Sequence, residues 1–167
     1  MSQVAKAPQG DKRPFMLRKG ISGIQDLNLK PVSITTATVT LTPEAHAGRV
    51  VVLNRAAGIA VTLPAATGSG DPYTIFVGTT FTGAASIACA GDDIFVGTAV
   101  LFADAGATVV GFNTTATSDT IDLLGTSNST GGLAGESIEL VDIAADTWMV
   151  RLVSDAGGTE ATPFNAP

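Results

Sequence analysis

The stretch ESIELVDIAADTWMVRLVS, residues 136–154, decides the fold class of this chain. In its second half, apolar and more polar positions alternate strictly, and the positions that point to one side are Trp148, Val150 and Leu152. Such alternation is typical of a strand with one buried face. The first half carries apolar residues at 138, 140 and 143 before a turn at 144–146, and the break in alternation predicts a β-bulge near Val141. The stretch therefore predicts a hairpin that places Trp148 in the core.

The rest of the chain repeats this pattern in short pieces. The segment AAGIAVTLPAATGSG, residues 56–70, is a short alternating strand that ends in a proline and a Gly/Ser-rich loop. No segment keeps a helical period for long, although residues 44–48 are expected to form one helical turn. Further strands are expected at 32–42, 48–54, 59–63, 73–77, 85–90, 94–96, 100–102, 108–112 and 120–124. The sequence thus predicts an all-β body, an antiparallel β-sandwich or barrel.

The composition supports this class and indicates a surface built for contact with protein. Ala, Thr and Gly contribute 25, 22 and 19 of the 167 residues, and small and β-branched residues suit strands and tight turns. Charged residues make up 14% of the chain, against roughly 25% in an average soluble domain. A surface with so few charges is one that other protein can cover.

Charge is divided unevenly along the chain. Residues 1–30 contain six basic and two acidic residues, whereas the remainder contains three arginines and 13 acids. The same N-terminal segment is rich in proline and glycine and carries scattered apolar residues, so it cannot build a core of its own. We therefore divide the chain into an extended basic arm, residues 1–31, and a β-rich body, residues 32–167. The arm could simply keep a terminus solvated or bind nucleic acid, but its mixture of cations and apolar anchors favours a protein partner.

Candidate catalytic and metal-binding residues are scarce. The single histidine, His46, is expected in a short polar loop at the surface, and the single cysteine, Cys89, is expected to be a small buried hydrophobe. Three acid pairs could bind calcium, but none has the spacing of a calcium loop, and we expect solvated turn carboxylates: Asp92 with Asp93, Asp119 with Asp122, and Asp142 with Asp146. The serines lie in turns without a nucleophile elbow. We expect no enzyme activity, no cofactor and no bound metal.

Neither a secretory nor a membrane-spanning segment is expected. The first residues, MSQVAKAPQGDKRPF, carry charges but no apolar core of a signal peptide. No run approaches the roughly 18 apolar residues of a membrane helix. The sequence thus predicts a soluble protein made in a cytoplasm, with no membrane partner.

Three stretches carry a family resemblance: GRVVVLNRAAGIAVTLPAATGSGDPYTIFVGT, GLAGESIELVDIAADTWMVRLV and the ending GTEATPF. Together they cover residues of about 48–164, and they resemble the small head decoration, or cement, proteins of tailed bacteriophages. Similar modules occur in phage tail fibres. The resemblance implies a β-rich body, usually a homotrimer, on the outer surface of the virion's capsid. It also implies an N-terminal extension that reaches over neighbouring subunits.

The resemblance leads to a specific functional expectation. The chain would be a non-enzymatic decoration protein that binds the outside of a phage head and bridges subunits of the major capsid protein. We expect the basic arm to supply the capsid contacts, through Lys12, Arg13, Phe15, Leu17, Arg18 and Lys19. The alternative is a receptor-binding or carbohydrate-binding module of a tail fibre, which should present exposed aromatic side chains.

Overall fold

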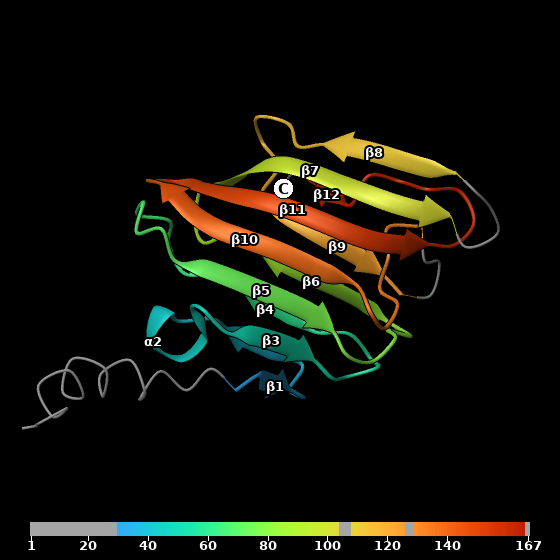
Figure 1. The fold of residues 1–167 in the computed structure, drawn as a ribbon, viewed down its shortest axis with the longest axis horizontal. Coiled ribbons are helices and arrows are strands. Elements are labelled where there is room, and N and C mark those ends of the chain that lie inside the picture. The colour runs from blue at the N-terminus through green and yellow to red at the C-terminus, as the bar shows by residue number, and fades with distance from the viewer. Residues whose placement is uncertain (1–29, 104–107, 126–128, 166–167) are drawn as a thin grey trace, which may run out of the picture.

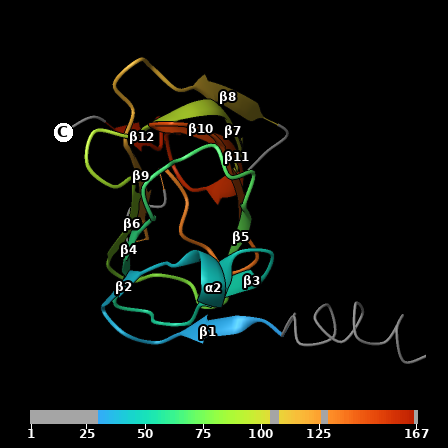
Figure 2. The same cartoon turned by 90° about the vertical axis from the view of Figure 1, so that its left-hand side faces the viewer.

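The computed structural model describes residues 30–103, 108–125 and 129–165. Within them, twelve strands and one four-residue helix form two sheets that face each other (Figures 1 and 2). This confirms the predicted all-β class and selects the sandwich over the barrel. The six arm residues predicted to contact a capsid lie outside the described residues.

Seven strands make the larger layer, sheet A, and five make sheet B, and Figure 2 shows the two layers edge-on. The spatial order in sheet A is β1 (Val32–Ile34), β3 (Val50–Leu53), β5 (Pro72–Val77), β10 (Ser137–Ala144), β11 (Thr147–Ala156), β7 (Ile94–Ala103) and β8 (Val109–Asn113). The order in sheet B is β12 (Phe164–Asn165), β9 (Thr120–Leu124), β6 (Ala84–Ala88), β4 (Ala60–Thr62) and β2 (Thr38–Thr40).

Both sheets are mixed, whereas the sequence predicted antiparallel pairing throughout. From β1 to β6 the chain changes sheet after every strand, so each strand reaches its neighbour in the same sheet only after one full coil around the core. Strands joined in this way run parallel: β3 pairs in parallel with β1 and β5, and β4 with β2 and β6. The connection between parallel neighbours is here a strand of the opposite sheet.

The predicted hairpin is present as β10 and β11. Its register runs from Ser137 paired with Val153 to Asp142 paired with Trp148, and it shifts between Asp142 and Ala144. The bulge therefore lies one or two residues beyond its predicted place near Val141. In the turn, Asp146 adopts a left-handed backbone with φ of 59°, which aspartate tolerates better than most residues.

β11 also pairs in parallel with β7 along ten residues, from Thr147 opposite Ile94 to Ala156 opposite Ala103. The sequence predicted two short strands in place of β7, at 94–96 and 100–102. They are one continuous strand because Gly97 does not turn the chain. A Cβ at Gly97 would lie on the backbone carbonyl of Val150, so only glycine allows this close approach.

The core fills the space between the two sheets. Trp148 is 1% exposed, and its ring meets that of Tyr73 edge to face, with centroids 5.5 Å apart and planes at 73°. Cys89 is buried as predicted, and its burial raises the pKa of its thiol. Phe164 in β12 is 7% exposed and pairs its backbone with Ile121, so the C-terminal segment packs on the body's own sheet B.

Candidate functional site

The point where the arm joins the body is held by one arginine. The Nε and Nη2 atoms of Arg49 donate hydrogen bonds to the carbonyl oxygen of Lys30, at 3.0 and 2.9 Å. Its Nη1 atom donates to the carbonyl oxygen of Ala45, in the helix α2 (Pro43–His46), at 2.7 Å. The chain therefore enters β1 at a fixed position, on the outermost strand of sheet A.

Helix α2 also corrects the prediction for His46. The helical turn expected at 44–48 is present at 43–46, but His46, which was expected at the surface, is 9% exposed. The backbone N–H of Thr42 donates to its Nδ1 atom at 3.0 Å. The imidazole ring thus closes the first turn of the helix and has a structural partner.

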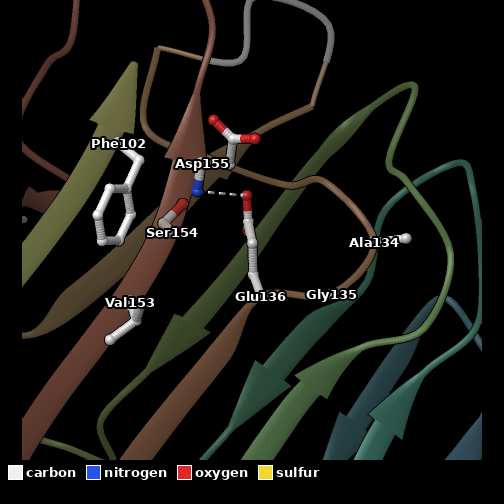
Figure 3. A pocket seen from close by; sticks show the side chains of 7 residues that line it. All are labelled: Phe102, Ala134, Gly135, Glu136, Val153, Ser154 and Asp155. Atoms are coloured by element: carbon white, nitrogen blue, oxygen red, sulfur yellow. Dashed lines mark hydrogen bonds between the residues drawn. The ribbon is translucent and has the colours of Figure 1, made fainter. Parts of the chain in front are cut away.

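A pocket of about 320 Å³ opens where β10 begins and where β7 and β11 end (Figure 3). Phe102 and Val153 form an apolar wall, and Glu136 comes from the loop before β10. The carboxylate of Glu136 accepts hydrogen bonds from three backbone N–H groups: Gly132 at 2.7 Å, Leu133 at 2.9 Å and Asp155 at 3.3 Å. Both of its oxygens accept from the backbone and so tie the loop to β11, while Asp155 contributes an exposed carboxylate to the lining.

Burial governs the ionisation of Glu136. Glu136 is 5% exposed, so desolvation raises the pKa of its carboxyl group. The N–H donors of Leu133 and Gly132 counteract part of that rise. No histidine, cysteine or lysine lines the pocket. The ionisable residues of its lining are Glu136 and Asp155.

The structure revises the prediction for two of the acid pairs. Within the described residues, no three histidine, cysteine, aspartate or glutamate side chains are close enough to hold an ion. A second pocket, of about 500 Å³, is lined by Asp92, Asp93 and Asp119. Asp93 is 5% exposed and accepts a hydrogen bond from the backbone N–H of Ala66 at 2.6 Å. The expectation of solvated turn carboxylates is thus wrong for Asp93.

The same expectation fails for Asp142, which is 3% exposed. Its carboxylate accepts hydrogen bonds from the backbone N–H groups of Thr67, Gly68 and Ser69, at 2.6 to 3.1 Å. The hydroxyl groups of Thr67 and Ser69 also donate to it, at 3.0 and 2.9 Å. Five donors from one loop therefore surround a single carboxylate on β10. This arrangement pins the loop between β4 and β5 to the start of the β10–β11 turn.

Acid is expected to weaken the fold through Asp142. Burial raises the pKa of its carboxyl, but the donors of Thr67, Gly68 and Ser69 outweigh burial and lower it from 3.8 to about 2. Because the folded state holds this proton less tightly, the stabilisation is complete above a pH of about 4 and is lost as the pH falls through about 2. Urea unfolding of the wild type and of Asp142→Asn, from about pH 6 to pH 2, measures this. The stability difference should shrink below about pH 4, and a constant difference would contradict the assignment.

Large apolar side chains gather on the outward face of sheet A, by which we mean the side of sheet A turned away from sheet B. Eight large hydrophobic residues are exposed within the described residues, and six of them lie on this face: Val50, Phe76, Val96, Phe102, Val109 and Val153. The neighbours of these residues along each strand point into the core or lie at the end of the strand. Leu101, for example, is buried next to the exposed Phe102. In Figure 1 no described element lies over this face.

The outward face of sheet B is different. One row across it consists of Thr38, Ala60, Ser86 and Asp122, paired strand to strand. Exposed large apolar side chains are therefore more frequent on the outward face of sheet A than on that of sheet B, although a polar row also crosses sheet A: Thr74, Glu139, Arg151, Thr98 and Asn113. This surface was not predicted from the sequence, although strands such as β7 carry apolar residues at both alternating sets of positions.

No family model, curated protein or solved structure matches the chain. In the part of the chain that the structure describes, no helix is long and apolar enough to cross a membrane. The resemblance to phage decoration proteins therefore remains a prediction from the sequence.

Proposed function

We propose that this protein is a capsid decoration protein, which binds the outer surface of a phage head and stabilises it by bridging subunits of the major capsid protein. The proposal combines the sequence resemblance with the architecture of the body. The linings of these two pockets contain carboxylates but no histidine, cysteine or lysine, and the exposed apolar side chains on the outward face of sheet A suit contact with protein.

The observation that carries the proposal is the junction between a basic arm and an acidic body. Residues 1–30 have a net charge of +4, whereas residues 31–167 have a net charge of −10. Arg49 fixes the end of this arm at the edge of sheet A through the carbonyl oxygen of Lys30. The body thus holds the arm at a defined position, from which its cations and apolar side chains can reach a neighbouring protein.

Bridging would strengthen a shell through multivalency. An arm and a body that bind different capsid subunits act on each other at high effective concentration, so weak individual contacts combine into tight attachment. An outward force on the shell must then break these contacts as well as those between capsid subunits. The homotrimer implied by the resemblance would multiply the effect by adding arms.

The alternative, a carbohydrate-binding module of a tail fibre, has less support. Sugar binding by stacking requires exposed aromatic rings, yet Trp148 and Tyr73 are each 1% exposed and pack against each other. The exposed aromatic residues Phe76 and Phe102 lie on β5 and β7, with β10 and β11 between these strands, so the two rings do not form a cluster on which a sugar could stack.

Replacing Phe15 and Leu17 together by Ala is expected to weaken binding to decoration-free capsids at least about tenfold, or roughly 1.4 kcal/mol. Both side chains are expected to enter apolar pockets on the capsid, and truncation removes that burial. Co-sedimentation of purified protein with capsids over a range of concentrations measures the effect. Circular dichroism should show an unchanged body, because the core residues of the body lie between Ile34 and Phe164, outside the arm.

A matched control uses two other apolar residues of the same arm, Ile24→Ala with Leu27→Ala, and should reduce binding much less. If the wild-type protein does not bind capsids, the proposed function is wrong. If both double variants bind like the wild type, the arm is not the anchor, although the protein would still be a decoration protein.

A further inference from the structure

The pocket at the end of β7 and β11 has an acidic side and an apolar side. Its ionisable residues, Glu136 and Asp155, are both acids, and its described lining contains no lysine, arginine or histidine. Phe102 and Val153 form the apolar side, and they are 45% and 43% exposed. In Figure 3, Phe102 lies on one side of Ser154 and Glu136 lies on the other. A ligand that enters from solvent therefore meets negative charge and an aromatic ring together.

The lining has spare capacity to accept hydrogen bonds. The Asp155 carboxylate is exposed, and no described residue donates to it. In Glu136, Oε1 accepts from two backbone N–H groups and Oε2 from one, so Oε2 has room for a further donor. Ser154 is 2% exposed, and its Oγ atom makes no hydrogen bond of regular geometry within the described residues. The N–H groups of Ala134 and Gly135, by contrast, already donate to other parts of the chain. The pocket therefore suits a ligand that donates hydrogen bonds.

The charges around the pocket select a cation. The nearest basic residue on β11, Arg151, forms an ion pair with Glu139 and does not line the pocket. The net charge of −10 over residues 31–167 attracts cations to the body as a whole. A guanidinium group carries several N–H donors in one plane, and it stacks well on an aromatic ring such as that of Phe102. An arginine side chain thus matches both sides of the pocket.

The surroundings of the pocket indicate that this arginine belongs to a protein. The volume of about 320 Å³ is at the lower end of ligand pockets, which span roughly 300–1,000 Å³, so it suits one side chain. Val109 is the register partner of Phe102, and Phe76 lies in the same row as Val153. These two neighbours are 54% and 36% exposed. A free amine leaves them in water, whereas a protein segment with apolar residues beside its arginine can cover them.

We propose that this pocket binds an arginine side chain of a partner protein, with the guanidinium group between the ring of Phe102 and the carboxylates of Asp155 and Glu136. Apolar residues on either side of the arginine would contact Val109 and Phe76. The proposal is independent of the proposed function, because the site lies on the body and its test requires no capsid. It gives the body a contact of its own, separate from the contacts expected of the arm.

The test is a titration of the isotope-labelled full-length protein, followed by nuclear magnetic resonance, with the blocked peptide acetyl-leucyl-arginyl-leucine amide. The arginine probes the pocket, and the two leucines probe the apolar side chains around it. Saturable shifts are expected for backbone amides at 101–103, 132–136 and 153–156, with a dissociation constant on the order of 1 mM. The control peptide carries citrulline in place of arginine, which keeps the shape and removes the charge, and it should give no saturable shifts there.

Variants at exposed positions separate the two sides of the pocket. Asp155→Asn removes the charge and keeps the shape, and it should raise the dissociation constant at least about threefold. Phe102→Ala removes the ring and should have an effect of the same size. The matched control, Asp92→Asn, removes an exposed carboxylate from the second pocket and should bind like the wild type. The free diamine putrescine, which has no apolar flanks, should bind more weakly than the arginine peptide.

The proposal is overturned if the arginine peptide gives no saturable shifts, whether the pocket cannot bind it or residues 1–29 already cover it. Equal binding of the citrulline peptide overturns it as well, and so does wild-type affinity in both Asp155→Asn and Phe102→Ala. Tighter binding of putrescine would assign the pocket to a small free amine and thus contradict a protein partner.

Discussion

Replacing Asp142 by Ala is expected to lower the free energy of unfolding by about 3 kcal/mol. The carboxylate is 3% exposed and accepts hydrogen bonds from five donors of residues 67–69. Hydrogen bonds to a charged group are each worth roughly 1.5–3 kcal/mol, although water can reach part of this exposed loop once the carboxylate is gone. The loop also loses its link to the β10–β11 turn, so the effect should exceed that of an ordinary surface substitution.

Asp142→Asn separates the charge from the shape of the side chain. An amide keeps one oxygen acceptor, but its NH₂ group cannot accept from the N–H groups of the loop, so about half of the loss is expected. Denaturant unfolding followed by circular dichroism measures both variants. Asp146→Asn is a nearby control, because it removes an exposed carboxylate in the same turn and keeps a side chain that tolerates the left-handed backbone of this position. A change below about 0.5 kcal/mol for Asp142→Ala would contradict the structural role assigned here.

Local patterns in the sequence predicted most of the strands. The alternation of Trp148, Val150 and Leu152 correctly indicated β11 and its buried face. The pairing of strands was harder, because it depends on which sheet each strand joins. The steps between sheets from β1 to β6 produce parallel neighbours, and nothing in the spacing of apolar residues distinguishes them from a series of hairpins.

The functional surfaces were predictable to different degrees. Asp142 stood out in the sequence only as one of several turn acids, since its donors come from residues 67–69, more than 70 positions away. The outward face of sheet A required knowledge of which residues share a face. Phe76 and Val153 lie in the same row, on either side of Ser137, because β5 and β11 both pair with β10. Only the assembled sheet brings them together.

Replacing Trp148 by Ala is expected to lower the free energy of unfolding by about 4 kcal/mol, within the roughly 3–5 kcal/mol typical of a large aromatic residue in a core. The side chain is 1% exposed and lies on the inward side of β11, between the two sheets. Truncation leaves a cavity and removes the edge-to-face contact with Tyr73. Circular dichroism must follow this unfolding, because Trp148 is the only tryptophan of the chain and its fluorescence is lost with it.

Tyr73→Phe is the control that distinguishes loss of packing from loss of polar contacts. Burial raises the pKa of Tyr73 to about 12, and its hydroxyl has no hydrogen-bond partner among the described residues. Phenylalanine keeps the ring against Trp148 and removes a buried polar group without a partner, so we expect the free energy of unfolding to change by less than about 1 kcal/mol or to rise. A large loss for Tyr73→Phe would mean that the hydroxyl group has a partner in solution, for example a buried water molecule. A small loss for Trp148→Ala would mean that the two sheets can close around the missing ring.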